Sequence, residues 1–512
     1  MKELFLFVRP PRPLWPFNSP ASAFWPPLAF ASLAAALREN VRDLRVEILD
    51  APALEMGWRT LERQLHERHP AFVGIGEEAV SCVEGLRLAR LAKALGARVI
   101  AGGCFFGQVA PEALRTGLID VVVHGEGELT VVELVQALRE SPSASLAKVN
   151  GISFLSSAPS DSSRTTPGSQ CITTPPRALL PNLDALPFPA YDLLPMHRYG
   201  ARSVNHPHLA AVELSRGCFG SCDFCVLWRQ MGRFNGQRMV PDLRVKSPER
   251  LLEEVRVLVR QYGRRYLGWV DPCFNAHPQA PAQLAELLLR EGLQTGQSAW
   301  VRTDALVRDA ESGALASCVR AGLNEVYLGI ERPDAAGLAA LRKTSGAADA
   351  RAALGILRGQ FPQVLAVGSF IYGLPADTPA SVRAIHRLAA ELDLDQFFFI
   401  PLTPLPGTAG WSSELWDPTG ERFREFNFLP TGRPHGRHAE LERALLWSLL
   451  TNWPAARVRG YFHRTFCRDN RRRRVQRRLT LRGAQFHLGR ILRRVLGGPD
   501  ELGLVFPSWY EG

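Results

Sequence analysis

Three cysteines crowd into eight residues of this 512-residue chain, where Cys218, Cys222 and Cys225 form a C-x3-C-x2-C pattern. Thiolates are soft ligands that select zinc or iron–sulfur clusters. Structural zinc takes four ligands in spaced pairs, and the sequence has no second C-x2-C pair. A three-cysteine loop suits a 4Fe-4S cluster with one iron open to a substrate or cofactor, and Gly217 and Gly220 let the loop curl around it. The alternatives are three core cysteines and a zinc site completed by a distant residue.

The stretch that carries these cysteines opens a region of alternating strands and helices, residues 206–420. Six strand-like runs, LAAVELS, RYLGWVD, SAWVRT, EVYLGIE, LAVGSFIYGLP and QFFFIPLTPLPGT, are separated by segments of helical length. They predict a partial or full TIM-type barrel of parallel strands, whose chemistry sits at the carboxyl ends of the strands. Those ends carry the cysteine loop, Asp271, Arg302, Glu331, Gly373 and Thr403.

Residues 1–140 alternate in the same way, with almost wholly apolar strand-like runs between helical stretches. Strands buried on both faces predict a doubly wound, Rossmann-like α/β domain, which binds ligands at the carboxyl ends of its strands. Residues 141–205 are predicted to form a linker with a mobile loop at 156–170, which is rich in Ser, Pro and Thr. Residues 421–512 are predicted to form a helical, basic C-terminal region.

The cysteine loop, ELSRGCFGSCDFCVL, resembles that of the radical S-adenosylmethionine (SAM) superfamily. The resemblance implies that the three cysteines hold a 4Fe-4S cluster, that SAM chelates its fourth iron, and that Phe224 packs near the adenine. Reductive cleavage of SAM then gives a 5′-deoxyadenosyl radical. Five further motifs follow in the order of that family, with Arg332 in place of the usual serine. They are WVDPCF with Asp271, RTDAL with Arg302, LGIERPD with Glu331, IYGLPADT and PLTPLPGT.

The same resemblance implies roles for three charged residues at the strand ends. Asp271 would accept from the SAM ammonium group, and Arg302 would donate to the SAM carboxylate, which arginine can bind in bidentate geometry. Glu331 matches the acidic end of the family's fourth strand. For all three residues the alternative is a structural salt bridge at the end of the barrel.

The N-terminal region resembles the cobalamin-binding domain that precedes many radical SAM barrels, on the stretches WPPLAFASLAAAL, VGIGEEA, VIAGGCF and VVVHGEGELT. Its glycines would let the backbone approach a flat corrin. It lacks the D-x-H-x-x-G motif that supplies a cobalt ligand, because His124 has neither flanking residue. The alternatives are a substrate-binding or docking domain that has lost the cofactor, and helix capping for Glu126 and Glu128. The candidate cobalamin contacts are Gly76, Glu77, Gly102, Gly103, Gly125, Glu126 and Gly127.

Together the two resemblances imply a cobalamin-dependent enzyme that methylates an unactivated carbon of a small-molecule or natural-product substrate. They also imply an electron donor of the flavodoxin or ferredoxin type. The alternatives are radical cyclisation, ring contraction or oxidation without methyl transfer, and a membrane- or partner-docking protein. Methylthiotransferases are disfavoured, because their first domain holds a second cluster on three cysteines and only Cys82 and Cys104 are available here.

The net charge of +11 is concentrated near the C-terminus, where residues 454–495 hold fourteen arginines and one acidic residue. We expect this segment to form a solvated or core-packed helix rather than a peripheral contact with a membrane or a partner. Nucleic-acid binding is disfavoured, because 56 arginines against 5 lysines indicate a GC-rich genome, which raises the arginine content of the whole chain. Nine cysteines and an N-terminal apolar run of about six residues argue against a disulfide framework and a signal peptide. We therefore expect a cytoplasmic protein.

Overall fold

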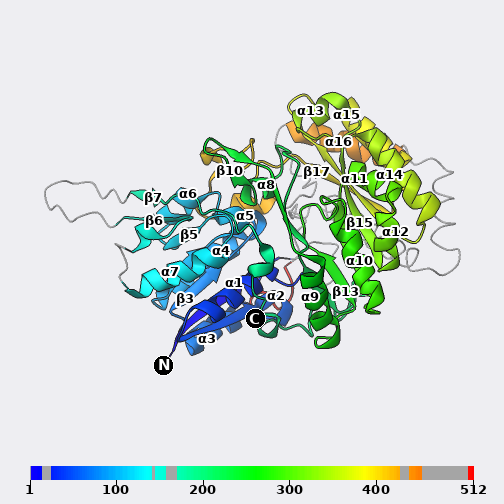
Figure 1. Ribbon diagram of the computed structural model, residues 1–512. Helices are drawn as coiled ribbons and strands as arrows, with labels where there is room; N and C mark the ends of the chain where they lie inside the picture. Colours follow the sequence, from blue (N-terminus) through cyan, green and yellow to red (C-terminus); the bar gives the residue numbers. More distant parts are fainter. Residues whose placement is uncertain are drawn as a thin grey trace.

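A computed structural model describes residues 2–13, 25–140, 145–156, 170–203, 205–426, 437–451 and 506–512. Two sheets lie side by side, the first built from the N-terminal residues and the second from the middle of the chain (Figure 1). The predicted fold class, a Rossmann-like domain followed by a parallel partial barrel, is confirmed. Residues 157–169 of the predicted loop, the arginine-rich segment 454–495 and Cys467 lie outside the described residues.

The first sheet has seven strands: β1 (Glu3–Arg9), β2 (Leu44–Asp50), β3 (Phe72–Ile75), β4 (Arg98–Ala101), β5 (Val121–Val123), β6 (Ile152–Leu155) and β7 (Cys171–Thr173). Their order is β2-β1-β3-β4-β5-β6-β7, parallel up to β5 and antiparallel beyond it. The sheet therefore continues into the stretch predicted as a linker, because runs as short as ISFL and CIT show no periodicity.

Helices cover both faces of this sheet: α1 (Leu28–Asn40), α2 (Ala51–Leu54), α3 (Trp58–Arg68), α4 (Cys82–Ala94), α5 (Gly103–Phe106), α6 (Ala110–Arg115) and α7 (Glu128–Glu140). Phe5 and Phe7 of β1 belong to the core cluster that includes α1 and α7. Their neighbours Leu4 and Leu6 belong to the cluster that includes α3, α4 and α6, on the opposite face. This alternation is what a doubly wound domain requires.

The second sheet has six strands: β8 (Leu209–Val212), β13 (Tyr266–Trp269), β14 (Gly296–Val301), β15 (Leu323–Glu331), β16 (Leu365–Tyr372) and β17 (Gln396–Pro401). All are parallel, and each predicted run overlaps one of them, with β14 and β15 beginning two residues before their runs. Within the described ranges β8 and β17 do not pair with each other, so the barrel is partial.

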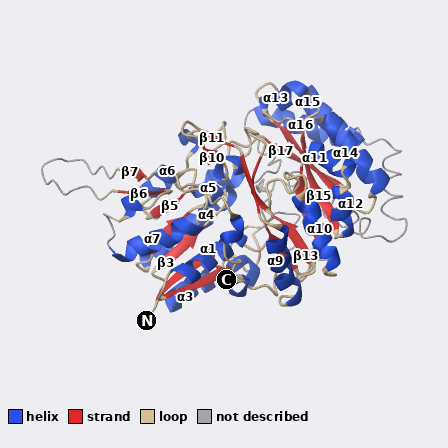
Figure 2. Ribbon diagram, viewed as in Figure 1, coloured by secondary structure: helices blue, strands red, loops and turns tan. Residues whose placement is uncertain are grey.

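Helices separate the barrel strands and form its outer layer (Figure 2). They are α9 (Pro248–Arg260), α10 (Ala280–Arg290), α11 (Thr303–Glu311), α12 (Ala314–Arg320), α13 (Ala335–Ala340), α14 (Ala347–Gln360) and α15 (Pro379–Glu391). The excursion between β8 and α9 contains β9 (Ser215–Cys218), α8 (Leu227–Gln230), β10 (Arg233–Phe234), β11 (Met239–Val240) and β12 (Asp242–Val245). β9 pairs with β12 in an antiparallel ribbon.

The proline-rich connection between the two domains is fixed to both of them. Tyr191 is buried, and its hydroxyl donates to Glu254 of α9 at 2.6 Å and to the carbonyl of Ala211 at 3.2 Å. The backbone N–H of Ala190 donates to Ala31 of α1 at 3.0 Å. This part of the connection is therefore packed between the two domains, and it contains two short 3-10 turns, Leu183–Ala185 and Tyr191–Leu193.

The described parts of the C-terminal region pack on both domains. Helix α16 (Arg437–Thr451) packs against α15, as expected of an amphipathic helix. Residues 421–426 instead pack on the first domain, where Arg424 pairs with the buried Glu84 at 2.9 Å. Tyr510 donates to the same carboxylate at 2.7 Å. Residues Glu421–Glu425 form a short 3-10 helix and residues 506–512 form turns, and both segments are held by the first domain.

We expect Glu84→Ala to lower the free energy of unfolding by about 3–5 kcal/mol, because it leaves the Arg424 guanidinium buried without this partner. Tyr510→Phe deletes one hydrogen bond to the same carboxylate and should lower it by about 1 kcal/mol. Urea unfolding followed by circular dichroism measures both values. Equal losses in the two variants would contradict a central role for the Glu84–Arg424 pair.

No helix in the described ranges is both long enough and apolar enough to span a membrane.

Candidate functional site

The cysteine loop begins where β9 ends, at the carboxyl side of the barrel's first strand. Gly217 has φ +94°, and a side chain there would collide with the backbone of Asp242 on β12, so only glycine fits. The indole of Trp228 donates to the carbonyl of Cys222 at 2.8 Å, and the backbone N–H of Cys225 donates to the same carbonyl at 3.2 Å. The loop that carries the cysteines is thus held at both ends.

The sulfurs of the loop surround a space that glycine leaves open. A Cβ on Gly220 would lie 3.6 Å from the Sγ of Cys218 and 3.9 Å from the Sγ of Cys222. In the described part of the chain, no three His, Cys, Asp or Glu side chains converge on one point as they would around a single ion. Each cysteine of a 4Fe-4S site binds a different iron, so its three thiols need not converge on one point as the ligands of a single zinc ion do.

The thiolate is the form of cysteine that binds metals, and the electrostatic environment favours it most at Cys218. A hydrogen bond from Cys273 lowers the pKa of Cys218 to about 6. Burial raises the pKa of Cys222 to about 11 and also raises that of Cys225. The ammonium group of Lys343 acts in the opposite direction and lowers the pKa of all three.

Arg302 lies over the cysteine loop, and its predicted contact with the SAM carboxylate stays a prediction. Its guanidinium carbon lies 4.6 Å from the ring centre of Phe219, and its Nη1 lies 3.3 Å from the position of a Cβ on Gly220. Its Nη2 donates to Asp304 at 2.5 Å and to Thr344 at 2.7 Å. Arg302 therefore brings a fixed positive charge to the edge of the cluster cavity.

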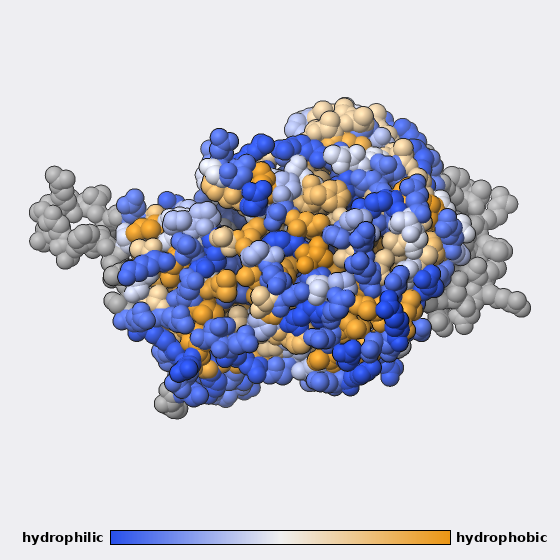
Figure 3. Space-filling model, viewed as in Figure 1, coloured by the Kyte–Doolittle hydropathy of each residue, from blue (hydrophilic) through white to orange (hydrophobic). Residues whose placement is uncertain are grey.

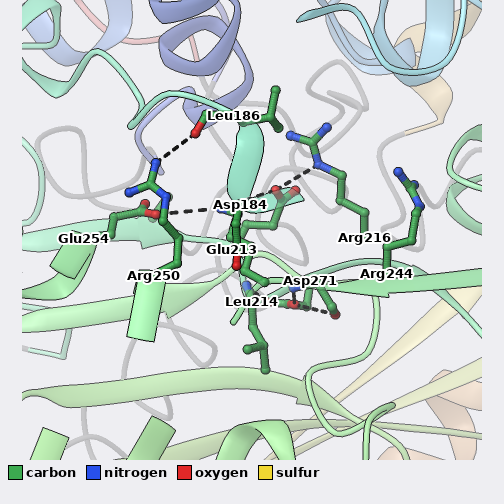
Figure 4. Close-up of polar contacts among 12 residues, drawn as sticks. Asp184, Leu186, Glu213, Leu214, Arg216, Arg244, Arg250, Glu254 and Asp271 are labelled. Carbon is green, nitrogen blue, oxygen red and sulfur yellow. Dashed lines mark hydrogen bonds and ion pairs between the residues drawn. The ribbon is translucent and has the colours of Figure 1, made fainter. Parts of the chain in front are cut away.

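Asp271 is buried beneath the loop, and its oxygens already have donors. They accept from the N–H of Leu214 at 3.2 Å, and from the N–H and hydroxyl of Ser215 at 2.5 and 2.7 Å (Figure 4). Burial raises the pKa of Asp271 to about 7. This carboxylate therefore holds the turn between β8 and β9 that leads to the cysteines, while its contact with the SAM ammonium group stays a prediction.

Glu331 ends β15 at a bulge, with φ +64°. Its carboxylate is buried 3.7 Å from the Nζ of Lys343, and burial raises its pKa. Lys343 was not predicted from the sequence, because it belongs to no motif. The one feature that could have pointed to it is that the chain has only five lysines. Glu331 and Lys343 bring a charge pair to the same strand ends as Arg302.

Arg332, which replaces the family's serine, joins the ends of β15 and β16. It forms a buried bidentate pair with Asp377, at 2.7 and 2.9 Å. Asp377 also accepts from the N–H groups of Gly373 and Leu374, at 2.7 and 2.9 Å. The acidic residue of the GLPADT motif therefore fixes the turn after β16.

Phe224 lies half-buried against apolar residues at the same end of the barrel. Its neighbours in this small cluster are Leu341, Ile371, Leu374 and Leu402. An apolar surface beside the cysteines is what an adenine ring needs for packing, as the resemblance implies for Phe224.

In the first domain the predicted glycine loops converge at the carboxyl ends of β3 and β4. A Cβ on Gly103, where φ is +80°, would lie 3.8 Å from the Cα of Gly76, and one on Gly102 would lie 3.3 Å from the carbonyl of Val123. These contacts leave bare backbone at the edge of the sheet, a surface that a flat corrin can approach.

The first domain meets the cysteine loop at the same edge. A Cβ on Gly125, where φ is +63°, would lie 3.7 Å from the carbonyl of Gln230 in α8. The thiol of Cys104 is close enough to Cys225 for the two to interact electrostatically. The predicted corrin-binding edge and the predicted cluster loop are therefore neighbours.

The two glutamates among the predicted corrin contacts are engaged within the protein. Glu77 forms a buried pair with Arg12, and burial raises its pKa. Glu126 lies 2.7 Å from Nη2 of Arg244 and 3.4 Å from Nη1 of Arg216, both on the barrel side. These residues fix the edge on which the glycines lie.

Arg216 is the centre of an ionic network between the domains, and Figure 4 shows its contact with Glu213. It pairs with Glu128 at 2.6 Å and with Glu213 at 2.9 Å, besides Glu126. All four side chains are almost fully buried, and Arg216 lies two residues before the first cluster cysteine. Sequence reasoning missed this network, because its partners are far apart in the chain.

His124 is not placed to bind a cobalt ion, since both ring nitrogens have partners. Nδ1 lies 2.9 Å from the carbonyl of Gly107, and Nε2 lies 2.7 Å from the hydroxyl of Ser153. Burial lowers the pKa of His124 from its ordinary value of 6.5. The structure thus agrees with the absence of the D-x-H-x-x-G motif.

The lowered pKa of His124 predicts a loss of stability in mild acid. The unfolded chain gains a proton at this histidine below about pH 6.5, while the folded chain does not, so the stability that His124 contributes above that pH decreases as the pH falls. We expect His124→Gln, which keeps a donor and an acceptor, to show a smaller decrease in Tm between pH 7.5 and 5.5 than the wild type. Parallel pH profiles of Tm would contradict this assignment.

Side chains of hydrophobic residues gather near the middle of the molecular face in Figure 3, between the first domain and the barrel. The candidate site lies where these two parts of the chain meet.

Comparison with known families gives two matches. Residues 18–135 match the family described as the B12 binding domain, and residues 212–389 match the radical SAM superfamily. The first match covers strands β2 to β5 of the first sheet, and the second covers strands β13 to β16 of the second sheet.

Named relatives cover most of the chain. An uncharacterized methyltransferase of Pyrococcus horikoshii is 30% identical over 75% of this chain and 78% of its own length. An anaerobic magnesium-protoporphyrin IX monomethyl ester cyclase of Rubrivivax gelatinosus is 23% identical over 79% of this chain and 68% of its own length. The hopanoid C-3 methylase of Methylococcus capsulatus is 28% identical over 67% of this chain and 60% of its own length.

Solved structures share the fold. TsrM, a radical SAM methyltransferase from Kitasatospora setae, superposes with a TM-score of 0.59 at 20% identity, over 80% of this chain and 74% of that one. The cobalamin-dependent radical SAM enzyme OxsB gives 0.58 at 16% identity, over 76% of this chain and 52% of that one. At these identities the similarity supports the arrangement of the two domains and no more.

Proposed function

The chain belongs to the radical SAM enzymes that carry a B12-binding domain, and from that premise we propose that it transfers a methyl group from SAM to an unactivated carbon of a small organic substrate. Its cofactors are a 4Fe-4S cluster, SAM and cobalamin. The relative in Pyrococcus horikoshii and the hopanoid C-3 methylase are named as methyl-transferring enzymes, which supports this choice of reaction.

The observation that carries the proposal is the contact between the two cofactor-binding edges. The loop at Gly125 touches α8, which directly follows the cysteine loop, and Cys104 interacts with Cys225. A radical formed at one edge and a methyl donor held at the other can reach one substrate only if these edges adjoin. Proximity of the reacting groups is a main source of rate enhancement in enzymes.

The protein's contribution is to bind, orient and exclude water, while the cofactors supply the difficult chemistry. When bound, the cluster supplies the electron that cleaves SAM, and cobalamin carries the methyl group. Cys218, Cys222 and Cys225 bind three irons, Arg302 and Lys343 provide positive charge for the SAM carboxylate, and Phe224 packs on the adenine.

On the other side, the backbone at Gly76, Gly102, Gly103 and Gly125 receives the corrin. Gly127 packs against the side chain of Leu33, where a Cβ would lie 2.9 Å from it, and its contact with the corrin stays a prediction. Asp271 holds the turn before β9, and so fixes the position of the cysteine loop.

A second candidate is a radical cyclisation or oxidation that uses the same cofactors without methyl transfer. The similarity to an anaerobic magnesium-protoporphyrin IX monomethyl ester cyclase, which extends over 79% of this chain, favours this second reaction. For either reaction we propose a flavodoxin- or ferredoxin-like protein as the electron donor, and a small molecule as the substrate, with no nucleic-acid partner.

An isotope balance separates the two candidates. Reconstituted enzyme is incubated anaerobically with a reductant, methyl-labelled SAM and an extract of small molecules, and S-adenosylhomocysteine and 5′-deoxyadenosine are quantified. Methyl transfer predicts both products, with the label in a new compound. 5′-Deoxyadenosine without S-adenosylhomocysteine or a labelled compound would refute methyl transfer and support the second candidate.

A further inference from the structure

Two large apolar side chains are exposed on the barrel strands near the candidate site. The exposed fractions are 46% for Trp300 on β14 and 36% for Val270, which directly follows β13. Their sequence neighbours Ala299, Val301 and Trp269 are buried in the core cluster that the outer helices complete. Because side chains alternate across a strand, Trp300 and Val270 face the opposite, helix-free side of the sheet.

The strand register places a second aromatic ring beside Trp300. Tyr327 on β15 is its direct pairing partner, and the two rings lie 4.7 Å apart at an interplanar angle of 26°. The Tyr327 hydroxyl donates to Glu325 at 2.7 Å, which fixes the ring. One face of Trp300 is thus covered by a parallel ring, while nearly half of its surface stays open.

The first domain contributes another ring to this side of the sheet. The indole of Trp25 lies directly against Gly268 of β13, where any side chain would collide with it. Arg9 donates to the backbone carbonyl of Trp25 at 2.8 Å and is itself paired with Asp50, at 2.6 Å. We call Trp25, Val270, Trp300 and Tyr327 the aromatic wall.

The wall lies next to Arg302, whose guanidinium packs on Phe219 of the cysteine loop. Arg302 directly follows β14 in an extended conformation, so it lies two residues beyond Trp300 on the same side, roughly 6–7 Å further along the chain. Arg302 lies at the edge of the space that the cysteine sulfurs surround. A molecule on the wall would therefore lie beside Arg302, on the side of the sheet that adjoins the cysteine loop.

The charges near the wall are already balanced. Glu325 accepts from Tyr327 and lies 2.9 Å from His206, so these three side chains form a polar network of their own. Arg302 pairs with Asp304, and Lys343 with Glu331, at the upper edge. The side chains of the wall itself are aromatic or aliphatic and carry no net charge.

We propose, building on the function proposed above, that the aromatic wall binds a flat, uncharged aromatic ring of the substrate by stacking on Trp300. A planar ring extends the existing Trp300–Tyr327 stack, and offset stacking contributes about 0.5–1.5 kcal/mol beyond the burial of area. A puckered, saturated ring of the same carbon skeleton cannot make this contact. The substrate class is therefore an uncharged compound with a planar aromatic ring.

The test compares two neutral probes with one skeleton, 2-naphthol and decahydro-2-naphthol, by anaerobic equilibrium dialysis against the holoenzyme. We expect 2-naphthol to bind roughly three- to tenfold more tightly, the ratio that the stacking energy gives. In Trp300→Leu this preference should disappear, and in Trp300→Phe it should be partly kept. Trp447→Leu, which removes a tryptophan that is 66% exposed on α16, is the matched control and should bind like the wild type.

Absorbance of the cluster and the corrin is recorded for every variant. Equal binding of the two probes by the wild type, or an undiminished preference in both Trp300 variants, would overturn the proposal. Loss of corrin absorbance in Trp300→Leu and Trp300→Phe would also overturn it, because the wall would then contact cobalamin. The isotope balance of the wild type tests methyl transfer separately. If methyl transfer fails there, the preference for the planar ring in the dialysis experiment is unaffected.

Discussion

Replacing any one of Cys218, Cys222 and Cys225 by alanine should reduce formation of 5′-deoxyadenosine from SAM to background, a loss of at least about a thousandfold. Each cysteine supplies a ligand to a different iron, so each deletion leaves an incomplete cluster site. The geometry supports this equivalence, because the sulfurs of Cys218 and Cys222 both face the space at Gly220, and Cys225 interacts electrostatically with both of the others.

Cys273 provides the matched control for these variants. It lies beside Cys218 and lowers the pKa of that thiol through a hydrogen bond, but it is outside the loop. Cys273→Ser keeps a hydrogen-bond donor beside Cys218. It should retain the cluster absorbance at about 400 nm, which comes from charge transfer between sulfur and iron. If a single loop variant kept both the absorbance and SAM cleavage, the assignment of the three ligands would be wrong.

The second large effect is expected at Arg216. Arg216→Met should lower the free energy of unfolding by about 3–5 kcal/mol, because it removes the common partner of three buried carboxylates. It should also lower both the cluster and the corrin content, since Arg216 joins the Gly125–Glu128 loop to the strand that carries Cys218. Lysine cannot replace the planar guanidinium, which contacts three groups at once.

Arg250 is the control for this substitution. It also lies at the contact between the barrel and the preceding chain, where it donates to the carbonyl of Leu186 at 2.9 Å and stacks on Phe188. Arg250→Met leaves no buried carboxylate without its partner, so we expect a loss of about 1–2 kcal/mol and unchanged cofactor content. Similar cofactor losses in both variants would show that Arg216 has no special role; urea unfolding and absorbance spectra measure both effects.

Features that depend on local pattern could be predicted from the sequence. Apolar runs between helical segments predicted both sheets, and the cysteine spacing predicted the loop at the end of the first barrel strand. Arg302 follows a barrel strand, as the RTDAL motif placed it, and lies over that loop. The antiparallel strands β6 and β7 escaped prediction, because three or four residues cannot show a period.

Features that depend on contacts between distant residues could not be predicted. The partners of Arg216 come from the first domain and from the end of β8, and no motif connects them. Asp271 fits an acidic motif position, but only the fold shows that its oxygens hold a backbone turn. Glu126 had been expected at the corrin, yet its carboxylate faces two arginines across the domain contact.

The most direct test of the account is SAM cleavage by the anaerobically reconstituted, cobalamin-loaded full chain, measured together with the cluster and corrin spectra. The account predicts both absorbances and the release of 5′-deoxyadenosine by the wild type, with no release by Cys222→Ala. A wild-type protein that holds a complete cluster but releases no 5′-deoxyadenosine under reducing conditions would contradict it.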